Sequence, residues 1–437
     1  MVVVPALRTP EPGAPVHVVG GRPLAGRISV QGSKNVALHL YAAALLVEDS
    51  LVLTGTPAIL DTEVCARIID HTGAHVDFSA DTFTVAAAGA ICPVIHPELG
   101  SRVRTTAVLA AAILARTGQV TFPVPGGDAF CARLIDRHLA AMQAAGAEVI
   151  ISGTSIRARC SPRGVQAFTV DVGTPYGPSL GATVTAMLLG ARAPGTTLVT
   201  RPSIEPEVTE TARFLRERGV GVVFDEDGLH VTGSERVGGG SFAVAGDRIE
   251  AATLIMAAAV TSGRVHLDNI TMADLPTGLT HSLSGAGIML TEGSTGGIHA
   301  HLEGSLRAVE SATAPHPGLP TDTAPQLTAL LTQAEGVSQI TERVYPQRDT
   351  HVEGLRAFGA DVSSVGSLIR IRGPVRLRGA DAGAADIRAV TALLIAALAA
   401  HGSSTIRGTY HLRRGYGHLL DNLATLGAAI TTSPGGP

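Results

Sequence analysis

The string TGAHV, residues 72–76, belongs to a set of related short strings that recurs along the chain. Five further copies follow it: AGAEV (145–149), RGVGV (218–222), SGAGI (284–288), FGADV (358–362) and LGAAI (426–430). Their leading glycines are 73, 73, 66, 74 and 68 residues apart, a regularity that chance placement of glycine would not give. We therefore predict six structural repeats.

A helical pattern precedes each glycine, as in DTEVCARIID (61–70), which places Val64, Cys65, Ile68 and Ile69 on one face. The glycine suits the C-terminal cap of that helix, because a positive φ costs it little. A β-rich stretch follows it, and an almost wholly apolar helix and a strand come before it. Each repeat is thus predicted to be helix, strand, helix, strand, strand, with one buried and one outer helix. Six such repeats indicate two globular halves of three repeats each.

Composition narrows the class of protein further. The chain has 437 residues, enough for two domains, and 16% of them are charged against a typical ~25%. The net charge of −4 lacks the basic excess of nucleic-acid binders. The longest apolar run (389–400) is shorter than the ~20 residues of a membrane span, and residues 1–15 have the composition of a disordered tail rather than a signal peptide. We expect a cytoplasmic protein, a monomer or small homo-oligomer, with small-molecule partners and neither nucleic acid nor membrane.

The cysteines do not suggest a metal centre. Four are present, Cys65, Cys92, Cys131 and Cys160, and none has a neighbour at the spacing of metal ligands. We expect reduced, mostly buried thiols, no metal and no cofactor.

Nine blocks of the chain carry candidate functional residues. They are QGSKNVALHLYAAALL (31–46), PGGDAFCARLIDRH (125–138), PSLGATVTAMLL (178–189), IEPEVTETARFL (204–215), GDRIEAATL (246–254), APHPGLPTDTAPQ (314–326), ERVYPQRDTHV (342–352), ADIRAVTALLIAALA (385–399) and YHLRRGYGHLLDNL (410–423). In this order and spacing they resemble the motifs of the UDP-N-acetylglucosamine enolpyruvyl transferases (MurA), over residues 17–432. The resemblance implies an α/β fold of two inside-out α/β barrels, each built from three βαβαββ-type repeats.

The resemblance also implies a split domain. One barrel is expected at 34–246, inserted into a second barrel formed by 1–33 plus 247–437. The active site is expected in the cleft between the barrels, where closure on the substrates would exclude water.

The reaction implied by the resemblance moves an enolpyruvyl group from phosphoenolpyruvate to an alcohol, which requires cations, a base and an acid. The expected cations are Lys34, Arg104, Arg133, Arg348, Arg388 and Arg414, although each alone could be a solvated surface charge. Asp322 matches the family residue that takes or positions the hydroxyl proton; its alternative role is to cap the following helix. Asp386 matches a second carboxylate, for which an orienting role is favoured and a surface pair with Arg388 is the alternative.

The acceptor side of the site is expected to bind a uridine nucleotide. The residues that match family contacts there are Asn35, Leu134, Ile135, Asp136, Ser179, Leu180 and Gly181. Glu205 and Asp247 match positions near the cleft, but a helix cap and a hinge salt bridge account for them equally well.

Departures from the family pattern gather on this nucleotide side. Gly177 replaces a lysine that reaches the nucleotide phosphates, and His39 replaces a proline, most simply as a tolerated residue of the core or cleft. Two acceptors therefore stay open, the 3-hydroxyl of UDP-N-acetylglucosamine and the 3′-hydroxyl of UMP, as in nucleoside-antibiotic pathways. A paralogue that binds nucleotide without catalysis is a third possibility. A synthase acting on shikimate 3-phosphate is disfavoured, because GSRVRTT (100–106) stands where its Gly-Asn-Ala-Gly-Thr run is expected.

The stretch PGGDAFCARLID (125–136) raises the question of the catalytic acid. Counting back from Arg133, Asp128 occupies the position at which most family members carry a reactive cysteine. Cys131 falls where the family has a small residue and is expected to behave as a small core hydrophobe. Asp128 is therefore predicted to be the acid.

Overall fold

The computed structural model describes most of the chain. Its described residues are 13–79, 81–86, 89–128, 130 and 134–432.

The described chain divides into two compact units. Unit 1 contains residues 13–30, 249–313 and 319–432, and unit 2 contains residues 31–248 and 314–318. The segment 314–318 is short and was not anticipated from the sequence.

Unit 2 contains three copies of the predicted helix, strand, helix, strand, strand repeat. The first copy is α1 (Lys34–Ala44), β3 (Leu51–Thr54), α2 (Leu60–His71), β4 (His75–Ser79) and β5 (Thr82–Ala86). The second is α4 (Thr106–Thr117), β6 (Gln119–Pro123), α5 (Asp136–Ala144), β7 (Ala147–Ser152) and β8 (Ser155–Cys160). The third is α6 (Leu180–Gly190), β12 (Thr196–Thr200), α7 (Pro206–Arg216), β13 (Gly221–Phe224) and β14 (Leu229–Thr232). The remaining elements are α3 (Pro97–Gly100), β9 (Thr169–Asp171), β10 (Gly173–Thr174), β11 (Gly177–Pro178) and β15 (Gly240–Ala243).

The strands of each repeat in unit 2 form their own sheet. The sheet orders are β15-β3-β5-β4, β6-β8-β7 and β13-β14-β12-β9, and β10 pairs with β11 as a separate hairpin. Within a repeat the pairing is antiparallel, whereas the added strands β15 and β9 pair parallel to β3 and β12.

Unit 1 contains three further copies. The fourth repeat is α8 (Arg248–Val260), β16 (Arg264–Asp268), the 3-10 helix η1 (Met272–Asp274), α9 (Thr277–Gly285), β17 (Ile288–Glu292) and β18 (Ile298–Leu302). The fifth is β19 (Glu310–Ala312), the 3-10 helix η2 (Thr321–Thr323), α10 (Ala324–Leu331), β20 (Gly336–Thr341), α11 (Val352–Ala357), β21 (Asp361–Val365) and β22 (Leu368–Gly373). The sixth is β23 (Asp381–Gly383), α12 (Ile387–Ala399), β24 (Ser403–Arg407), α13 (Tyr410–Arg413), α14 (Leu419–Thr425) and β25 (Ala429–Thr432).

The sixth repeat differs from the prediction because its last strand comes from the other end of the chain. Strand β1 (Val16–Val19) pairs antiparallel with both β24 and β25, in the sheet β23-β24-β1-β25. Strand β2 (Ala25–Ser29) pairs parallel with β16 in the sheet β17-β18-β16-β2, and the third sheet is β19-β20-β22-β21. The N-terminal strands thus complete two sheets of unit 1.

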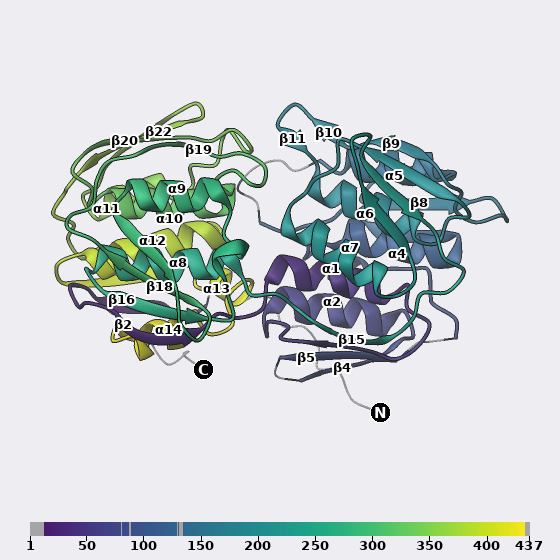
Figure 1. The fold of residues 1–437 in the computed structure, drawn as a ribbon, viewed down its shortest axis with the longest axis horizontal. Coiled ribbons are helices and arrows are strands. Elements are labelled where there is room, and N and C mark those ends of the chain that lie inside the picture. Colours follow the sequence, from purple (N-terminus) through teal and green to yellow (C-terminus); the bar gives the residue numbers. More distant parts are fainter. Residues whose placement is uncertain (1–12, 80, 87–88, 129, 131–133, 433–437) are drawn as a thin grey trace. The chain divides into compact units, whose positions relative to one another are not determined.

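The first helix of each repeat is buried, as predicted. In α12 every residue from Ile387 to Leu398 is buried, whereas in α14 the buried residues are Leu419 and Leu423. Within unit 1, α10 and α12 lie side by side (Figure 1), and within unit 2, α4 packs against α6. A helix that is apolar on all sides must be covered on all sides, and the surrounding sheets and outer helices supply that cover. Among the described residues, none of the helices has both the length and the apolar character of a membrane span.

One glycine of the repeat string was placed wrongly from the sequence. Gly285 was expected to be the capping glycine of the fourth repeat, but it is the last residue of α9, and its backbone is not left-handed. Gly287 has φ +95°, close to the φ of the corresponding glycines Gly73 and Gly146, both at +93°. SGAGI contains two glycines, and the string alone does not show which of them caps the helix. The observed end of α9 identifies Gly287 as the capping glycine.

Replacing these two glycines by alanine should give unequal losses of stability. Gly287→Ala places a residue with a Cβ at a left-handed backbone conformation and should lower the free energy of unfolding by about 1–2 kcal/mol. Gly285→Ala keeps an ordinary helical backbone and should cost clearly less. Urea denaturation of both variants measures the difference, and equal losses would show that the left-handed turn is not at Gly287.

Candidate active site

In unit 1 the carboxylate of Asp322 lies between two guanidinium groups. Arg348 donates from Nη1 to Oδ1 at 2.7 Å, and Arg388 donates from Nη2 to Oδ2 at 2.7 Å. Burial opposes ionisation of Asp322, but Arg388 and Arg348 outweigh it and hold the pKa of Asp322 well below its ordinary value. Asp322 is therefore ionised at neutral pH.

The structure excludes the alternative roles that the sequence left open for these residues. Asp322 lies in η2, and the residue at the N-terminal cap of α10 is Thr323, so Asp322 is not a helix cap. Arg348, Arg388 and Asp386 are all buried, which excludes solvated surface charges and a surface ion pair.

Asp386 holds the start of α12. Its Oδ1 accepts hydrogen bonds from the backbone N–H groups of Arg388 and Ala389 at 2.8 and 3.0 Å, and its Oδ2 accepts from the hydroxyl of Thr350. A carboxylate at a helix N-terminus with these donors is a cap that fixes the backbone of Arg388. The contacts favour an orienting role for Asp386.

Two residues that the sequence reasoning missed complete this cluster. Tyr416 is buried and accepts a hydrogen bond from Nη1 of Arg388 at 2.7 Å, so both ends of that guanidinium group are held. Glu342 is buried and binds the hydroxyl groups of Thr313 and Thr321 at 2.5 and 2.8 Å, which fixes the turn that carries Asp322. Both residues stand in blocks that had been singled out, but neither has a local signal that predicts its partner.

Arg414 follows α13 as its C-terminal cap residue, and it is buried. It lies two residues before Tyr416 in the same turn of chain. Unit 1 thus brings Asp322, Arg348, Arg388 and Asp386 into one hydrogen-bonded cluster, with Arg414 in the segment that carries Tyr416.

In unit 2 the start of α1 carries Lys34 and Asn35. The ammonium group of Lys34 forms an ion pair with Asp61 at 2.9 Å, and its backbone N–H donates to Oδ2 of Asp247 at 3.1 Å. The side-chain amide of Asn35 donates to Oε1 of Glu207 at 3.2 Å. Both residues are therefore held by acids of unit 2.

Arg248 links the two glutamates of the IEPE block. It donates to Oε2 of Glu207 at 3.2 Å and to Oε2 of Glu205 at 2.8 Å. The Oε1 atom of Glu205 accepts from the backbone N–H of His316 at 2.8 Å. Burial opposes ionisation of Glu207, but Arg248 outweighs it and lowers the pKa of Glu207. Glu207 and Arg248 were missed from the sequence, because their contact joins segments about forty residues apart.

The start of α6 carries the predicted residues Ser179, Leu180 and Gly181. Ser179 is the N-terminal cap, and its hydroxyl accepts from the backbone N–H of Ala182 at 3.4 Å. Leu180 and Gly181 are the first two helical residues, whose N–H groups have no partner within a helix. Such N–H groups are suited to bind an anion.

Gly177 lies in the hairpin just before α6, and its backbone explains the missing lysine. It has φ +112°, and a Cβ built on it would come within 2.6 Å of Cγ of Pro315. A lysine at this position would therefore be strained and would collide with the segment 314–318.

The remaining predicted residues lie around α5. Arg104 donates to the carbonyl oxygen of Leu134, an exposed residue, and Ile135 is the residue at the N-terminal cap of α5. Asp136 is the first residue of α5 and is 3.9 Å from Nε of Arg137. Asp128 is half-buried in the loop after β6. Arg133 and Cys131 lie outside the described residues.

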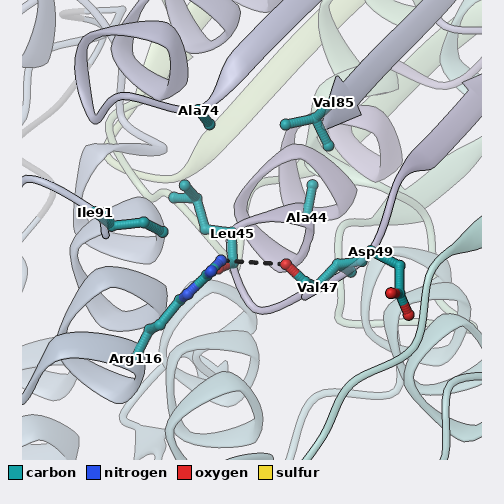
Figure 2. A pocket seen from close by; sticks show the side chains of 8 residues that line it. All are labelled: Ala44, Leu45, Val47, Asp49, Ala74, Val85, Ile91 and Arg116. Atoms are coloured by element: carbon teal, nitrogen blue, oxygen red, sulfur yellow. Dashed lines mark hydrogen bonds between the residues drawn. The ribbon is translucent and has the colours of Figure 1, made fainter. Parts of the chain in front are cut away.

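A small pocket at the C-terminal end of α1 is separate from these residues. Figure 2 shows Arg116 pointing into it, where Nη1 donates to the carbonyl oxygens of Leu45 and Val47 at 2.9 and 3.1 Å. These contacts satisfy carbonyl groups at the end of a helix, and none of the predicted site residues lines the pocket.

Comparison with known proteins gives full-length matches. The family model of EPSP synthase (3-phosphoshikimate 1-carboxyvinyltransferase) matches residues 18–423. A UDP-N-acetylglucosamine 1-carboxyvinyltransferase of Afipia carboxidovorans is 34% identical over 427 residues, covering 95% of this chain and 98% of the relative. UDP-N-acetylglucosamine 1-carboxyvinyltransferase 3 of Symbiobacterium thermophilum is 37% identical over 428 residues, covering 95% and 97%.

Two solved structures agree with the fold. The enolpyruvyl transferase NikO from Streptomyces tendae has a TM-score of 0.85 at 27% identity and covers 97% of this chain and 100% of its own. EPSP synthase from Acinetobacter baumannii has a TM-score of 0.77 at 21% identity, covering 96% and 100%, and supports the fold alone. The predicted fold of two inside-out α/β barrels is confirmed.

The ion pairs of Asp322 with Arg348 and Arg388 should make the stability of the protein depend on pH. Because the pKa of Asp322 is lowered in the folded protein, the stabilisation is fully present above the unfolded value near ~4 and is lost as the pH falls through the folded value. Asp322→Asn should therefore be less stable than the unmodified protein at pH 7, with a gap that narrows below about pH 4. Thermal unfolding of both proteins from pH 7 to pH 3 measures it. A gap that is absent at pH 7, or that widens in acid, would contradict this.

Proposed function

The chain belongs to the enolpyruvyl transferase family, and from this premise we propose that it transfers the enolpyruvyl group of phosphoenolpyruvate to a hydroxyl group of a uridine nucleotide. The products are the enol ether of the nucleotide and inorganic phosphate. The observation that carries the proposal is the carboxylate of Asp322 held between Arg348 and Arg388, because the reaction needs a base beside cations that bind an anionic substrate.

The proposed roles follow from the chemistry of each group. As the acceptor oxygen attacks C2 of phosphoenolpyruvate, Asp322 takes or positions the hydroxyl proton, and Asp128 supplies a proton to C3. Loss of a C3 proton and of phosphate then leaves the enol ether. Arg348, Arg388 and Arg414 would hold the phosphate and carboxylate, because guanidinium groups bind such oxyanions in a bidentate manner, and the ammonium group of Lys34 would add a compact positive charge.

We further propose that phosphoenolpyruvate competes with Asp322 for its arginines. An ionised Asp322 with so low a pKa is a weak base, and both guanidinium groups that lower its pKa are expected phosphate or carboxylate ligands. When the substrate anion draws Arg348 or Arg388 away, the pKa of Asp322 rises towards the range of a useful base. Substrate binding would thereby activate the base.

The proposed active site combines groups from both halves of the chain. We propose that the halves are the predicted barrels, 1–33 plus 247–437 and 34–246, except that residues 31–33, 247–248 and 314–318 belong with unit 2. The proposed site lies in the cleft between the barrels, and closure would exclude water. On this proposal Lys34, Asn35 and Asp128 act together with the Asp322 cluster in the closed enzyme. We propose that the protein works in the cytoplasm as a monomer or small homo-oligomer.

Our preferred acceptor is the 3-hydroxyl group of UDP-N-acetylglucosamine, which would place the enzyme in peptidoglycan synthesis. The names of relatives with 34% and 37% identity over almost the whole chain support this choice. Gly177 favours UMP as a second candidate, since its backbone and Pro315 leave no room for the cation expected beside a diphosphate. In either case Asn35, Arg104, Arg133, Leu134, Ile135, Asp136, Ser179, Leu180 and Gly181 are the proposed nucleotide contacts.

Phosphate release tests the reaction and the acceptor together. With phosphoenolpyruvate present, release should depend on one of the two nucleotides, and Asp322→Ala should lower the rate by about two or more orders of magnitude. Circular dichroism would confirm that the variant is folded. More than about a tenth of the normal rate would remove Asp322 from this role, and no release with either nucleotide would contradict the proposed function.

A cysteine-directed inhibitor tests the assignment of Asp128. The epoxide fosfomycin forms a thioether with a cysteine thiolate at the family position, which a carboxylate does not readily do. The enzyme should therefore resist fosfomycin, Asp128→Cys should become sensitive, and Cys131→Ser should change little. Inactivation of the unmodified enzyme with a mass shift on Cys131 would transfer the role to that thiol.

A further inference from the structure

His39 is a buried polar side chain with one ring nitrogen that has no hydrogen-bond partner among the described residues. It lies in α1, is 9% exposed, and its Nδ1 atom has no hydrogen-bond partner among the described residues. Its neighbours along the helix, Leu38 and Leu40, are buried and apolar. Because an unpaired buried nitrogen costs free energy that an apolar side chain would not, this imidazole requires an explanation.

The surroundings of His39 are polar, but the polar groups near it are bonded to other residues. The nearby carboxylate of Glu207 is bound by Asn35 and by Arg248, each at 3.2 Å. The nearby ring of His138 makes its Nδ1 contact with the hydroxyl of Thr185 at 2.8 Å. The described residues therefore place several polar groups around His39, and none of them forms a hydrogen bond with its Nδ1 atom.

The ionisation state of His39 limits what it could bind. Burial disfavours the imidazolium and lowers the pKa of His39 to about 4, against a smaller opposing effect of Glu207. At neutral pH the ring is uncharged, with one N–H donor and one acceptor nitrogen. Such a group suits a neutral hydroxyl, amide or carbonyl and not a phosphate.

The position of His39 relative to Asn35 indicates where such a group would lie. The two residues are four apart in α1 and share one face of that helix. Asn35 is the proposed contact to the acceptor near its reacting hydroxyl, and Gly181, another proposed contact, lies against His138, whose Cε1 would be 2.7 Å from a Cβ on Gly181. His39 is therefore next to residues assigned to the acceptor nucleotide.

We infer that His39 binds the acceptor, through a hydrogen bond between its Nδ1 atom and a neutral polar group on the sugar of the nucleotide. This inference rests on the proposed function and adds a residue that selects the acceptor. An acceptor that lacks the matching group would leave the imidazole unpaired, which is the arrangement that gives strong discrimination between close analogues.

The choice of substitutions can identify the nitrogen involved. His39→Leu keeps a similar volume without any polar atom. The side-chain amide of His39→Asn places a polar atom near the position of Nδ1, whereas that of His39→Gln places one near Nε2. The exposed His75, on β4 of the same unit, gives the control variant His75→Leu.

The expected result is a selective loss of acceptor binding. His39→Leu should raise the KM and the Kd of the nucleotide about tenfold or more, on the scale of one lost hydrogen bond to a buried group, with the KM of phosphoenolpyruvate within about twofold. His39→Asn should recover most of this loss and His39→Gln should not. His75→Leu should change neither constant. Thermal unfolding would show that each variant is folded, and the Asn and Gln variants decide the question if the Leu variant is not.

The outcomes separate this inference from the proposed function. Nucleotide Kd values from calorimetry with UDP-N-acetylglucosamine and UMP do not require turnover. If the enzyme binds nucleotide but His39→Leu leaves Kd unchanged, or if Asn and Gln behave alike, the inference is wrong while the proposed function stands. If nucleotide binds without any phosphate release, the reaction is wrong and the His39 variants still test the contact. If neither nucleotide binds, both fail.

Discussion

The contact on which the candidate site depends is the carboxylate of Asp322 held by Arg348 and Arg388, each at 2.7 Å. Two guanidinium groups can be buried near one another only if an anion lies between them. Before substrate binds, that anion is Asp322, and the surrounding structure serves to keep it there. Glu342 fixes the turn before it, Asp386 fixes the backbone of Arg388, and Tyr416 holds the far side of the guanidinium group. We propose that the same arrangement accepts a substrate anion in place of the carboxylate.

The charged cluster of unit 2 follows the same principle with the signs reversed. Here the acids outnumber the bases: Lys34 is held by Asp61, and Arg248 by Glu205 and Glu207. The glutamates also bind Asn35 and the backbone of His316, so that charge pairing positions groups at the start of α1 and in the segment 314–318. His39 stands out in this network because its Nδ1 atom takes no part in it.

Much of the fold could be predicted because its signals are local. The all-apolar helices and the repeated glycine string are each contained within a few residues, and they predicted six repeats and two halves. The string predicted the wrong capping glycine in SGAGI, because both Gly285 and Gly287 fit the pattern. Only the observed end of α9 distinguishes them. The string could not predict that β1 completes the sixth repeat, because that pairing joins residues almost four hundred positions apart. The contacts of Glu342, Tyr416 and Glu207 were missed for the same reason, since each joins separate segments of the chain.

Competition between phosphoenolpyruvate and Asp322 for the same two arginines can be measured as the affinity of phosphoenolpyruvate for Asp322→Asn. Calorimetry would give the Kd of phosphoenolpyruvate for the unmodified enzyme and for this variant, with and without saturating nucleotide. If the carboxylate competes with the substrate, removing its charge frees Arg348 and Arg388, and the variant should bind phosphoenolpyruvate more tightly although it turns over more slowly. Unchanged or weaker binding by a folded variant would show that Asp322 and phosphoenolpyruvate do not compete for these arginines.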